Sequence, residues 1–351
     1  MKEVIAKRIQ SARKLAGLSL RELADRMEGI VSHNAISKYE KAEMIPDSKV
    51  LLALAKALNV QADYFFRPFT IEIENIEFRK KSKLPTKNVA SIKEDVTGRL
   101  ERYVELEQFL QFSASFENPL ASVVIKTGEQ VEQAVEELRA VWKLGNNVLS
   151  NVIELLEDKE IKVIEIDAPL EFDGLSGWAS EDIPVIVVNK HYSIERKRFT
   201  ALHELAHLLL SFDEGLEHKT IERLCHRFAG AMLMPKETFL EELGSTRKNI
   251  SLSELITLKE SYGISIQALM ARAKDLEIIS SETYIAFRKW VNQHPDHKTE
   301  KGFGSFKGSE GSTRFKQLLY RATAEEIISM SKAANLANQK LAEFRDEYIA
   351  L

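Results

Sequence analysis

The sequence has only one cysteine, Cys225, among its 351 residues, so no internal disulfide can form. This suits a reducing compartment, and we expect a cytoplasmic protein. The chain has no unbroken apolar run of the roughly 20 residues that a membrane-spanning helix needs. Its first residues also lack the apolar core of a signal peptide. We therefore expect no membrane partner.

The chain also lacks a strong charge of either sign. Its formal net charge is -4, from 49 basic and 53 acidic side chains. This argues against a protein coated with nucleic acid along its whole length, but it allows one basic face. Hydrophobic residues make up 44% of the chain, enough for sizeable cores. The length is sufficient for two or three domains.

Residues 1–66 show a pattern typical of five short helices. Apolar residues recur at helical spacing up to Gly17, which ends the first helix. Ser19 and Glu22 form a capping-box pattern at the start of the second helix. The remaining helices are expected at residues 32–40, 48–58 and 61–65, with Ser32 and Ser48 as caps.

Two runs within this segment, Leu20-Arg21-Glu22-Leu23-Ala24 and Asn34-Ala35-Ile36-Ser37-Lys38-Tyr39-Glu40, resemble an Xre/Cro-type helix-turn-helix domain. The resemblance implies that the third helix enters the major groove of a double-stranded DNA operator. Its candidate DNA-binding residues are His33, Asn34, Ser37 and Lys38. Residues 1–65 carry 11 basic and 8 acidic side chains, which modestly supports DNA contact.

Modules of this type usually bind DNA as dimers, so we expect a homodimer. The alternative for residues 1–66 is a helical domain that docks onto another protein. Residues 67–130 are expected to be a connector. Alternating residues over 70–78 predict a strand, and a helix is expected from Pro85 to about Phe112. The basic cluster between them, Arg79, Lys80, Lys81 and Lys83, is typical of a solvated surface, with additional phosphate contact as the alternative.

Residues 131–280 predict a domain with a small sheet among helices. The expected strands are 161–166 and 184–189, and the expected helices following them are 193–211 and 220–232. Residues 281–351 are expected to form a helical C-terminal region with a helix at 323–348. Its Gly-, Ser- and Lys-rich segment 298–312 is predicted to be a mobile loop. The expected fold class is therefore α+β and mostly helical.

The most informative motif is His203-Glu204-Leu205-Ala206-His207. Residues four apart share one face of a helix, so both imidazoles can converge on one metal ion. Glu204 points beside that position, as a general base should when it takes a proton from water. We interpret the motif as a zinc-peptidase site, with His203 and His207 as Zn²⁺ ligands. The alternatives are two ordinary histidines on a helix, or a peptidase fold that has lost its chemistry.

A catalytic zinc site usually needs a third protein ligand. The downstream candidates are Asp213, Glu214, Glu217, His218, Glu222 and His226, and spacing alone does not choose among them. Glu222 and His226 share one face of the following helix, so either could approach the metal.

The runs Arg198 to Leu210 and Glu222 to Pro235 resemble the motifs of ImmA/IrrE-type zinc metallopeptidases. The resemblance extends over about residues 130–280. It implies a zincin-like domain in which Glu222 is the third zinc ligand. His226 stands where the family usually has Asn, so it is either a structural histidine or a contact to the substrate or transition state. Trp178, near an expected edge strand that could hold a substrate peptide, is either a core or rim aromatic or a substrate contact.

These resemblances imply a DNA-binding regulator with zinc-dependent endopeptidase activity. It would cleave a protein substrate, such as a helix-turn-helix repressor, and so relieve transcriptional repression. The alternative is a DNA-binding repressor or antitoxin-like regulator whose peptidase-like domain senses a ligand or partner without cutting. A third possibility is a general peptidase whose N-terminal module docks substrates.

Overall fold

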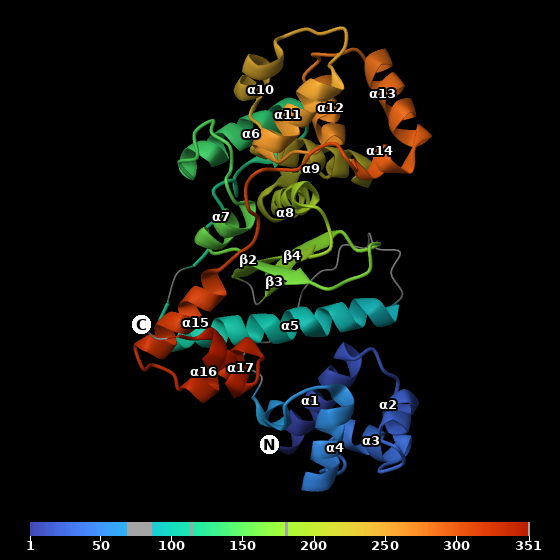
Figure 1. Cartoon of the computed structure of the whole chain (residues 1–351), viewed down its shortest axis with the longest axis vertical. Coiled ribbons are helices and arrows are strands. Elements are labelled where there is room, and N and C mark those ends of the chain that lie inside the picture. The colour runs from blue at the N-terminus through green and yellow to red at the C-terminus, as the bar shows by residue number, and fades with distance from the viewer. Residues whose placement is uncertain (69–85, 113–114, 180–181, 350–351) are drawn as a thin grey trace.

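The computed structural model describes residues 1–68, 86–112, 115–179 and 182–349. The N-terminal helices form one end of the molecule, and a long helix separates them from a small sheet covered by further helices (Figure 1). The expected strand at 70–78 and the basic cluster Arg79, Lys80, Lys81 and Lys83 lie outside the described residues. Within the described ranges, no helix is long and apolar enough to cross a membrane.

The N-terminal domain has four α-helices and a short 3₁₀ helix around one apolar core. Ser19 and Glu22 form the expected capping box, and Ser32 caps the third helix. The cap of the fourth helix is Asp47, whose carboxylate accepts from Val50 N, so the expected Ser48 cap is wrong by one residue. The elements are α1 Lys2–Leu15, α2 Leu20–Arg26, α3 His33–Glu40, α4 Ser48–Leu58 and η1 Ala62–Phe66.

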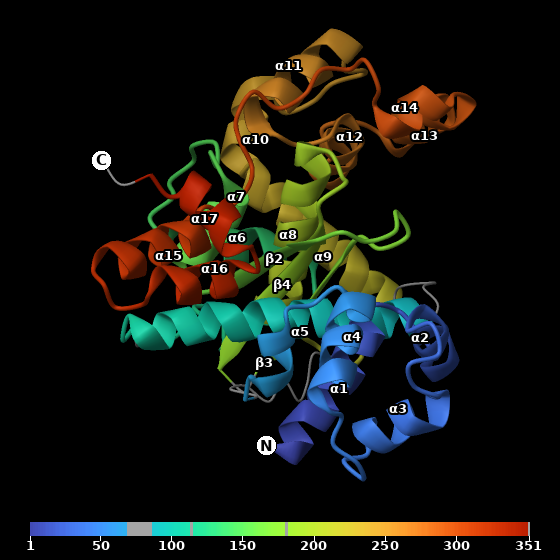
Figure 2. The same ribbon diagram turned by 60° about the horizontal axis from the view of Figure 1, so that its bottom comes forward.

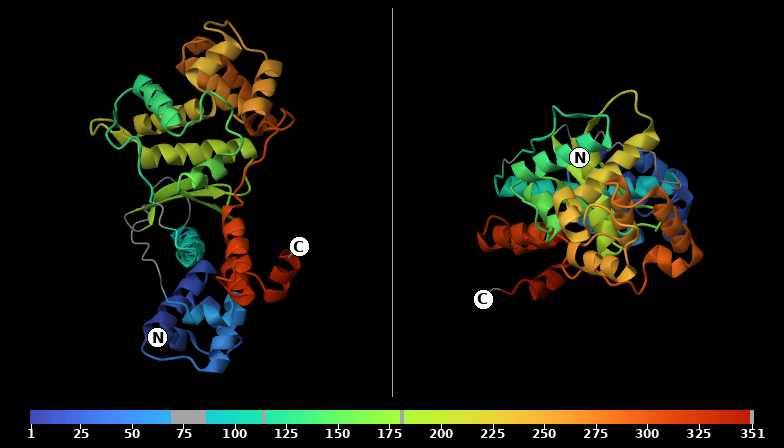
Figure 3. Two further views of the ribbon diagram at one scale, coloured as in Figure 1. Left: turned by 90° about the vertical axis from the view of Figure 1, so that its left-hand side faces the viewer. Right: turned by 90° about the horizontal axis from the view of Figure 1, so that it is seen from above.

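Helix α5, Thr86–Phe109, is the long helix expected after Pro85. It lies between the N-terminal domain and the sheet (Figure 3). A buried ion pair joins it to α1, with Arg8 Nη1 2.7 Å from Glu101 Oε2. On its other side, Val96 and Leu100 pack against the sheet. Helix α5 therefore packs against the N-terminal domain on one side and against the sheet on the other.

The sheet has the strand order β2-β4-β3. Strand β2, Lys162–Ile166, runs parallel to β4, Ile183–Asn189, and β3, Gly174–Ala179, pairs with β4 in antiparallel orientation. The middle of central β4 is apolar on both faces, because Val185 and Val187 face α5 while Ile186 and Val188 face the opposite core. The expectation of a single edge strand near Trp178 is corrected. The region 174–189 contributes two strands, β3 and β4; β3 lies at one edge of the sheet and β2 at the other.

The other face of the sheet carries α8, Ile194–Leu209, and α9, His218–Leu233, packs on α8. These helices match the expectations closely. The remaining elements of this region are β1 Val124–Ile125, α6 Gly128–Val141, α7 Val152–Asp158, β5 Ser211–Phe212, α10 Lys236–Leu243, α11 Leu252–Tyr262 and α12 Ile266–Asp275.

The C-terminal region begins with α13, Ser281–Gln293, and α14, Pro295–Thr299. It ends in α15 Arg314–Ala324, α16 Met330–Ala337 and α17 Leu341–Glu347, so the single helix expected at 323–348 is wrong. Helices α15 and α16 lie alongside α5 (Figure 2).

Residues 300–312, here called the strap, join α14 to α15 without regular structure. Glu310 of the strap forms a fully buried ion pair with Arg198 of α8, and its carboxylate accepts from the backbone N–H groups of Val152 and Ile153. Phe306 N donates to the Glu195 carboxylate. These contacts pack the strap against the domain, and the mobility expected for residues 298–312 stays a prediction.

Candidate metal centre

Helix α8 brings the two motif histidines to one point. Ser193 caps the helix by accepting from Arg196 N, and the apolar face of the helix is buried in the core. His203 and His207 are 7% and 9% exposed, one turn apart on the same face. Their Nε2 atoms lie 3.2 Å from each other.

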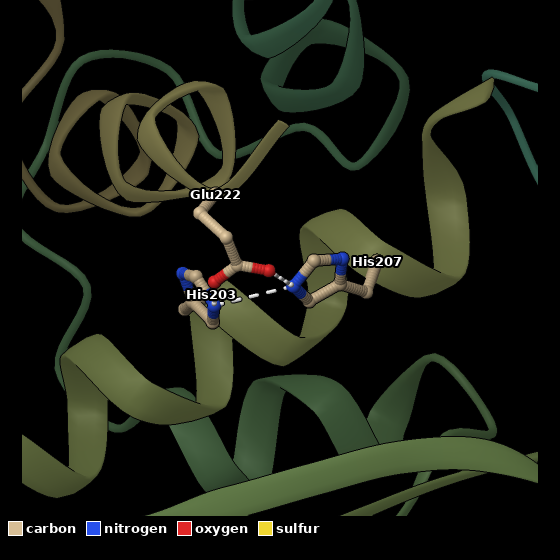
Figure 4. Close-up of side chains that lie close together, drawn as sticks. All are labelled: His203, His207 and Glu222. Atoms are coloured by element: carbon tan, nitrogen blue, oxygen red, sulfur yellow. Dashed lines mark hydrogen bonds and ion pairs between the residues drawn. The ribbon is translucent and has the colours of Figure 1, made fainter. Parts of the chain in front are cut away.

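Glu222 of α9 completes the cluster (Figure 4). Its two carboxylate oxygens lie 3.5 Å from His203 Nε2 and 3.4 Å from His207 Nε2. In a tetrahedral zinc site with bonds of about 2.0–2.1 Å, ligand atoms lie about 3.3–3.4 Å apart. Two imidazoles and one carboxylate are also a typical donor set of catalytic zinc. The residues present therefore fit a zinc ion.

The other expected candidates for the third ligand lie elsewhere or are more exposed. Asp213 pairs with Lys126 at 3.0 Å. His218 is exposed and its Nε2 lies 3.7 Å from Glu222 Oε1. Among the residues described, His203, His207 and Glu222 form the group whose ligand atoms converge, all within 4.8 Å of one another.

Glu204 points beside the cluster and meets the edge strand. Ser176 of β3 donates a hydrogen bond from Oγ to Glu204 Oε2 at 2.8 Å. The sequence patterns did not predict a role for Ser176. The pairing of β3 with β4 brings this hydroxyl to the helix, and no local pattern encodes that pairing.

Gly174 allows β3 to lie this close to α8. A Cβ at this position would lie 2.6 Å from Thr200 Cγ2, 2.9 Å from Val187 O and 3.5 Å from Glu204 Cγ. The Val187 carbonyl belongs to the backbone of β4, so it cannot move away from a new Cβ as a flexible side chain could. A glycine at the start of β3 therefore permits the contact between the strand and the Glu204 side chain.

His226 lies at the exposed rim of the cluster. Its ring stacks on Phe199, with centroids 5.9 Å apart, and is tilted against the His203 ring at 4.5 Å. Cys225 is buried on the other side, with Sγ 3.4 Å from His207 Nδ1. Trp178 is half-buried and contacts Phe116 at a centroid distance of 5.9 Å.

A cleft of about 440 Å³ opens beside the cluster. This volume lies within the usual range for ligand and substrate sites. Its lining includes His203, Glu204, Glu222, His226, Phe199, Thr200, Arg196 and residues 171–174. His226 thus faces the cleft, whereas Trp178 is outside the lining.

An ion network fixes α9 against its neighbours. Glu132 of α6 accepts from Arg227 of α9 at 2.8 Å and from Arg272 of α12 at 2.9 Å. Burial opposes ionisation of Glu132, but the charges and hydrogen bonds of the two arginines outweigh it and lower its pKa. The carboxylate therefore stays charged and links three helices, one of which carries Glu222.

The expected DNA-binding residues lie on α3. His33, Asn34 and Lys38 are exposed and Ser37 is half-buried. Ile36 is buried in the domain core on the opposite face. Arg13 of α1 holds α3 in place through a two-pronged ion pair with Glu40, at 2.6 and 2.7 Å.

Comparison with known families finds two different domains in this chain. Residues 9–65 match a family model described as helix-turn-helix. Residues 156–274 match a peptidase family model described as the IrrE N-terminal-like domain. No curated protein matches the chain. The expected fusion is confirmed: a helix-turn-helix DNA-binding domain is followed by a metallopeptidase-like domain, in a mostly helical α+β chain.

Proposed function

We propose that this protein is a DNA-binding transcriptional regulator with zinc-dependent endopeptidase activity. The observation that carries the proposal is the convergence of His203, His207 and Glu222, with donor atoms 3.2–3.5 Å apart. Glu204 lies beside this cluster, where a general base belongs. The match of residues 156–274 to a peptidase family supports the same proposal.

In this proposal, His203, His207 and Glu222 would hold Zn²⁺, which would supply Lewis acidity at the cleft. Glu204 accepts a proton from the attacking water and then donates it to the leaving amine. Ser176 orients Glu204 through its hydrogen bond to Oε2. His226, at the rim of the cleft, is placed to contact the substrate or the transition state.

The proposed substrate is a repressor-type protein, which the helix-turn-helix domain would bring to the cleft or meet on the same operator. Cleavage would relieve repression in the cytoplasm. His33, Asn34, Ser37 and Lys38 would contact the operator, and a homodimer would bind its two half-sites.

The test begins with metal content. Wild-type protein should carry about one zinc per chain by elemental analysis, and H203A and E222A should lose it. E217Q is the matched control, because Glu217 is the exposed residue just before α9. If E222A retains full zinc, Glu222 is not the third ligand.

Catalysis is tested with E204Q, which retains the size of the side chain but removes the base. It should retain zinc and DNA binding but lose at least 100-fold in peptide hydrolysis, on the order of a lost general base. Unchanged cleavage would contradict the mechanism. If neither protein cleaves and both give the same transcriptional output, the alternative of a non-cleaving regulator is favoured.

A further inference from the structure

A second cavity lies away from the metal cluster, at the junction of the connector helix, the sheet and the C-terminal helices. Its volume is about 280 Å³, which suits a small organic molecule better than a single water. Helix α5 contributes Arg99, Arg102 and Tyr103, which share a face at helical spacing. The other walls include Ile153, Val163, Ile164, Phe315 and Leu336.

The Tyr103 hydroxyl is a buried polar group in this wall. Tyr103 is 7% exposed, and Oη has no hydrogen-bond partner among the residues that the structure describes. Its ring packs against Phe315, with centroids 5.4 Å apart. A buried hydroxyl without a partner is costly, so a ligand that hydrogen-bonds to it would gain that energy.

Arg102 supplies a positive charge that no salt bridge with a described residue neutralises. Its neighbour Arg99 pairs with Asp95 at 2.9 Å, but Arg102 forms no salt bridge with any described residue. Burial, followed by the charges of Arg99 and Arg67, lowers the pKa of Arg102 to about 10, although the carboxylates of Asp95 and Glu101 act in the opposite direction. An anion in the cavity would offset both the burial of the Arg102 charge and its repulsion by the neighbouring arginines.

The acidic groups of the lining do not supply that anion. Glu165 is paired with Lys197 at 2.8 Å. Glu157 accepts a hydrogen bond from Ser312 Oγ, and burial raises its pKa to about 8, so it is mostly protonated at neutral pH. The rest of the surface is largely aliphatic or aromatic. The cavity thus combines one arginine without a salt bridge, one hydroxyl without a hydrogen-bond partner and several apolar side chains.

We propose that this cavity binds a small organic monocarboxylate. The carboxylate would lie against Arg102 and Tyr103 Oη, and the apolar body would lie between Phe315 and Ile164. This ligand site is separate from the metal cluster and does not depend on peptidase activity. An occupant would contact α5, β2 and the C-terminal helices together, because all three contribute to the lining.

The test is titration calorimetry on the full chain. The probes are 3-phenylpropionate and octanoate, with 3-phenylpropionamide as the uncharged match and inorganic phosphate as an anion without an apolar body. At least one carboxylate should bind once per chain, at least tenfold more tightly than the amide or phosphate. R102Q should lose about tenfold or more, because charge-assisted hydrogen bonds are the strong ones, and Y103F should lose a few-fold.

The matched control is R321Q, which removes an exposed arginine from α15 and should bind like the wild type. If R102Q fails to fold by circular dichroism, L336W decides, because an indole would fill the cavity and leave Arg102 in place. The proposal is overturned if neither carboxylate binds at millimolar concentration, if phosphate binds equally well, or if a folded R102Q or L336W binds with unchanged affinity.

Discussion

The buried pair between Arg198 and Glu310 gives the sharpest prediction about the stability of this fold. Both side chains are fully buried, and Arg198 Nη1 lies 2.7 Å from Glu310 Oε2. Arg198 belongs to α8, five residues before His203, whereas Glu310 belongs to the strap. The pair therefore attaches the helix of the metal cluster to a segment more than 100 residues away.

The perturbation is E310Q, which leaves an oxygen acceptor but removes the negative charge. Arg198 would then be a buried cation without its counter-charge, even though it still donates to Leu149 O at 2.6 Å. Removing one partner of a buried ion pair typically costs about 3–5 kcal/mol. We expect a loss near the lower value, because the amide oxygen can still accept from Ile153 N.

The assay is urea unfolding followed by tryptophan fluorescence. Trp142, Trp178 and Trp290 all lie outside the N-terminal domain, so the signal reports on the peptidase-like and C-terminal parts. E325Q, which breaks an exposed pair with Arg321, is the matched control and should change stability by less than about 1 kcal/mol.

A double-mutant cycle with R198M tests whether the pair itself is responsible. R198M with E310Q should cost at least about 1 kcal/mol less than the sum of the single changes, because the double variant removes both members of the pair. An E310Q variant with wild-type stability, or strictly additive losses, would refute the reasoning.

Three further predictions concern the edge strand and a buried acid. G174A should destabilise by about 1–3 kcal/mol in the same unfolding assay, because its Cβ would collide with Thr200 and the β4 backbone; G98A, whose Cβ meets only a flexible Arg102 atom at 3.6 Å, should cost nothing. S176A should lower kcat for peptide hydrolysis about tenfold with little change in KM and full zinc content, since Ser176 orients Glu204; an equal rise in KM would argue against that role. Burial raises the pKa of Glu157 from 4.5 to about 8 in the folded chain. Between these two pH values the folded state binds a proton that the unfolded state has lost, so the stability of the fold falls as the pH rises. The stability of E157Q relative to wild type should therefore be greater at pH 9 than at pH 5. If the free energies of unfolding of the two proteins change with pH in parallel, the raised pKa of Glu157 is contradicted.

Local patterns predicted much of this molecule. Helical spacing in the motif at residues 203–207 was enough to put two imidazoles on one face, because that geometry depends only on the pitch of a helix. The capping box of Ser19 and Glu22 and the apolar run of β4 were likewise encoded in neighbouring residues. The helices of the N-terminal domain followed from the same kind of signal.

Such local patterns could not predict contacts between segments that lie far apart in the sequence. Spacing could not choose Glu222 over His218 or His226, because the choice depends on how α9 packs on α8. The strand containing Ser176 was not expected as a separate element, since its pairing with β4 involves residues that no short-range period connects. The strap has the composition of a solvated loop, yet Glu310 is buried because Arg198 meets it across the fold. Periodicity describes one segment at a time, whereas burial and charge pairing depend on the segment that packs against it.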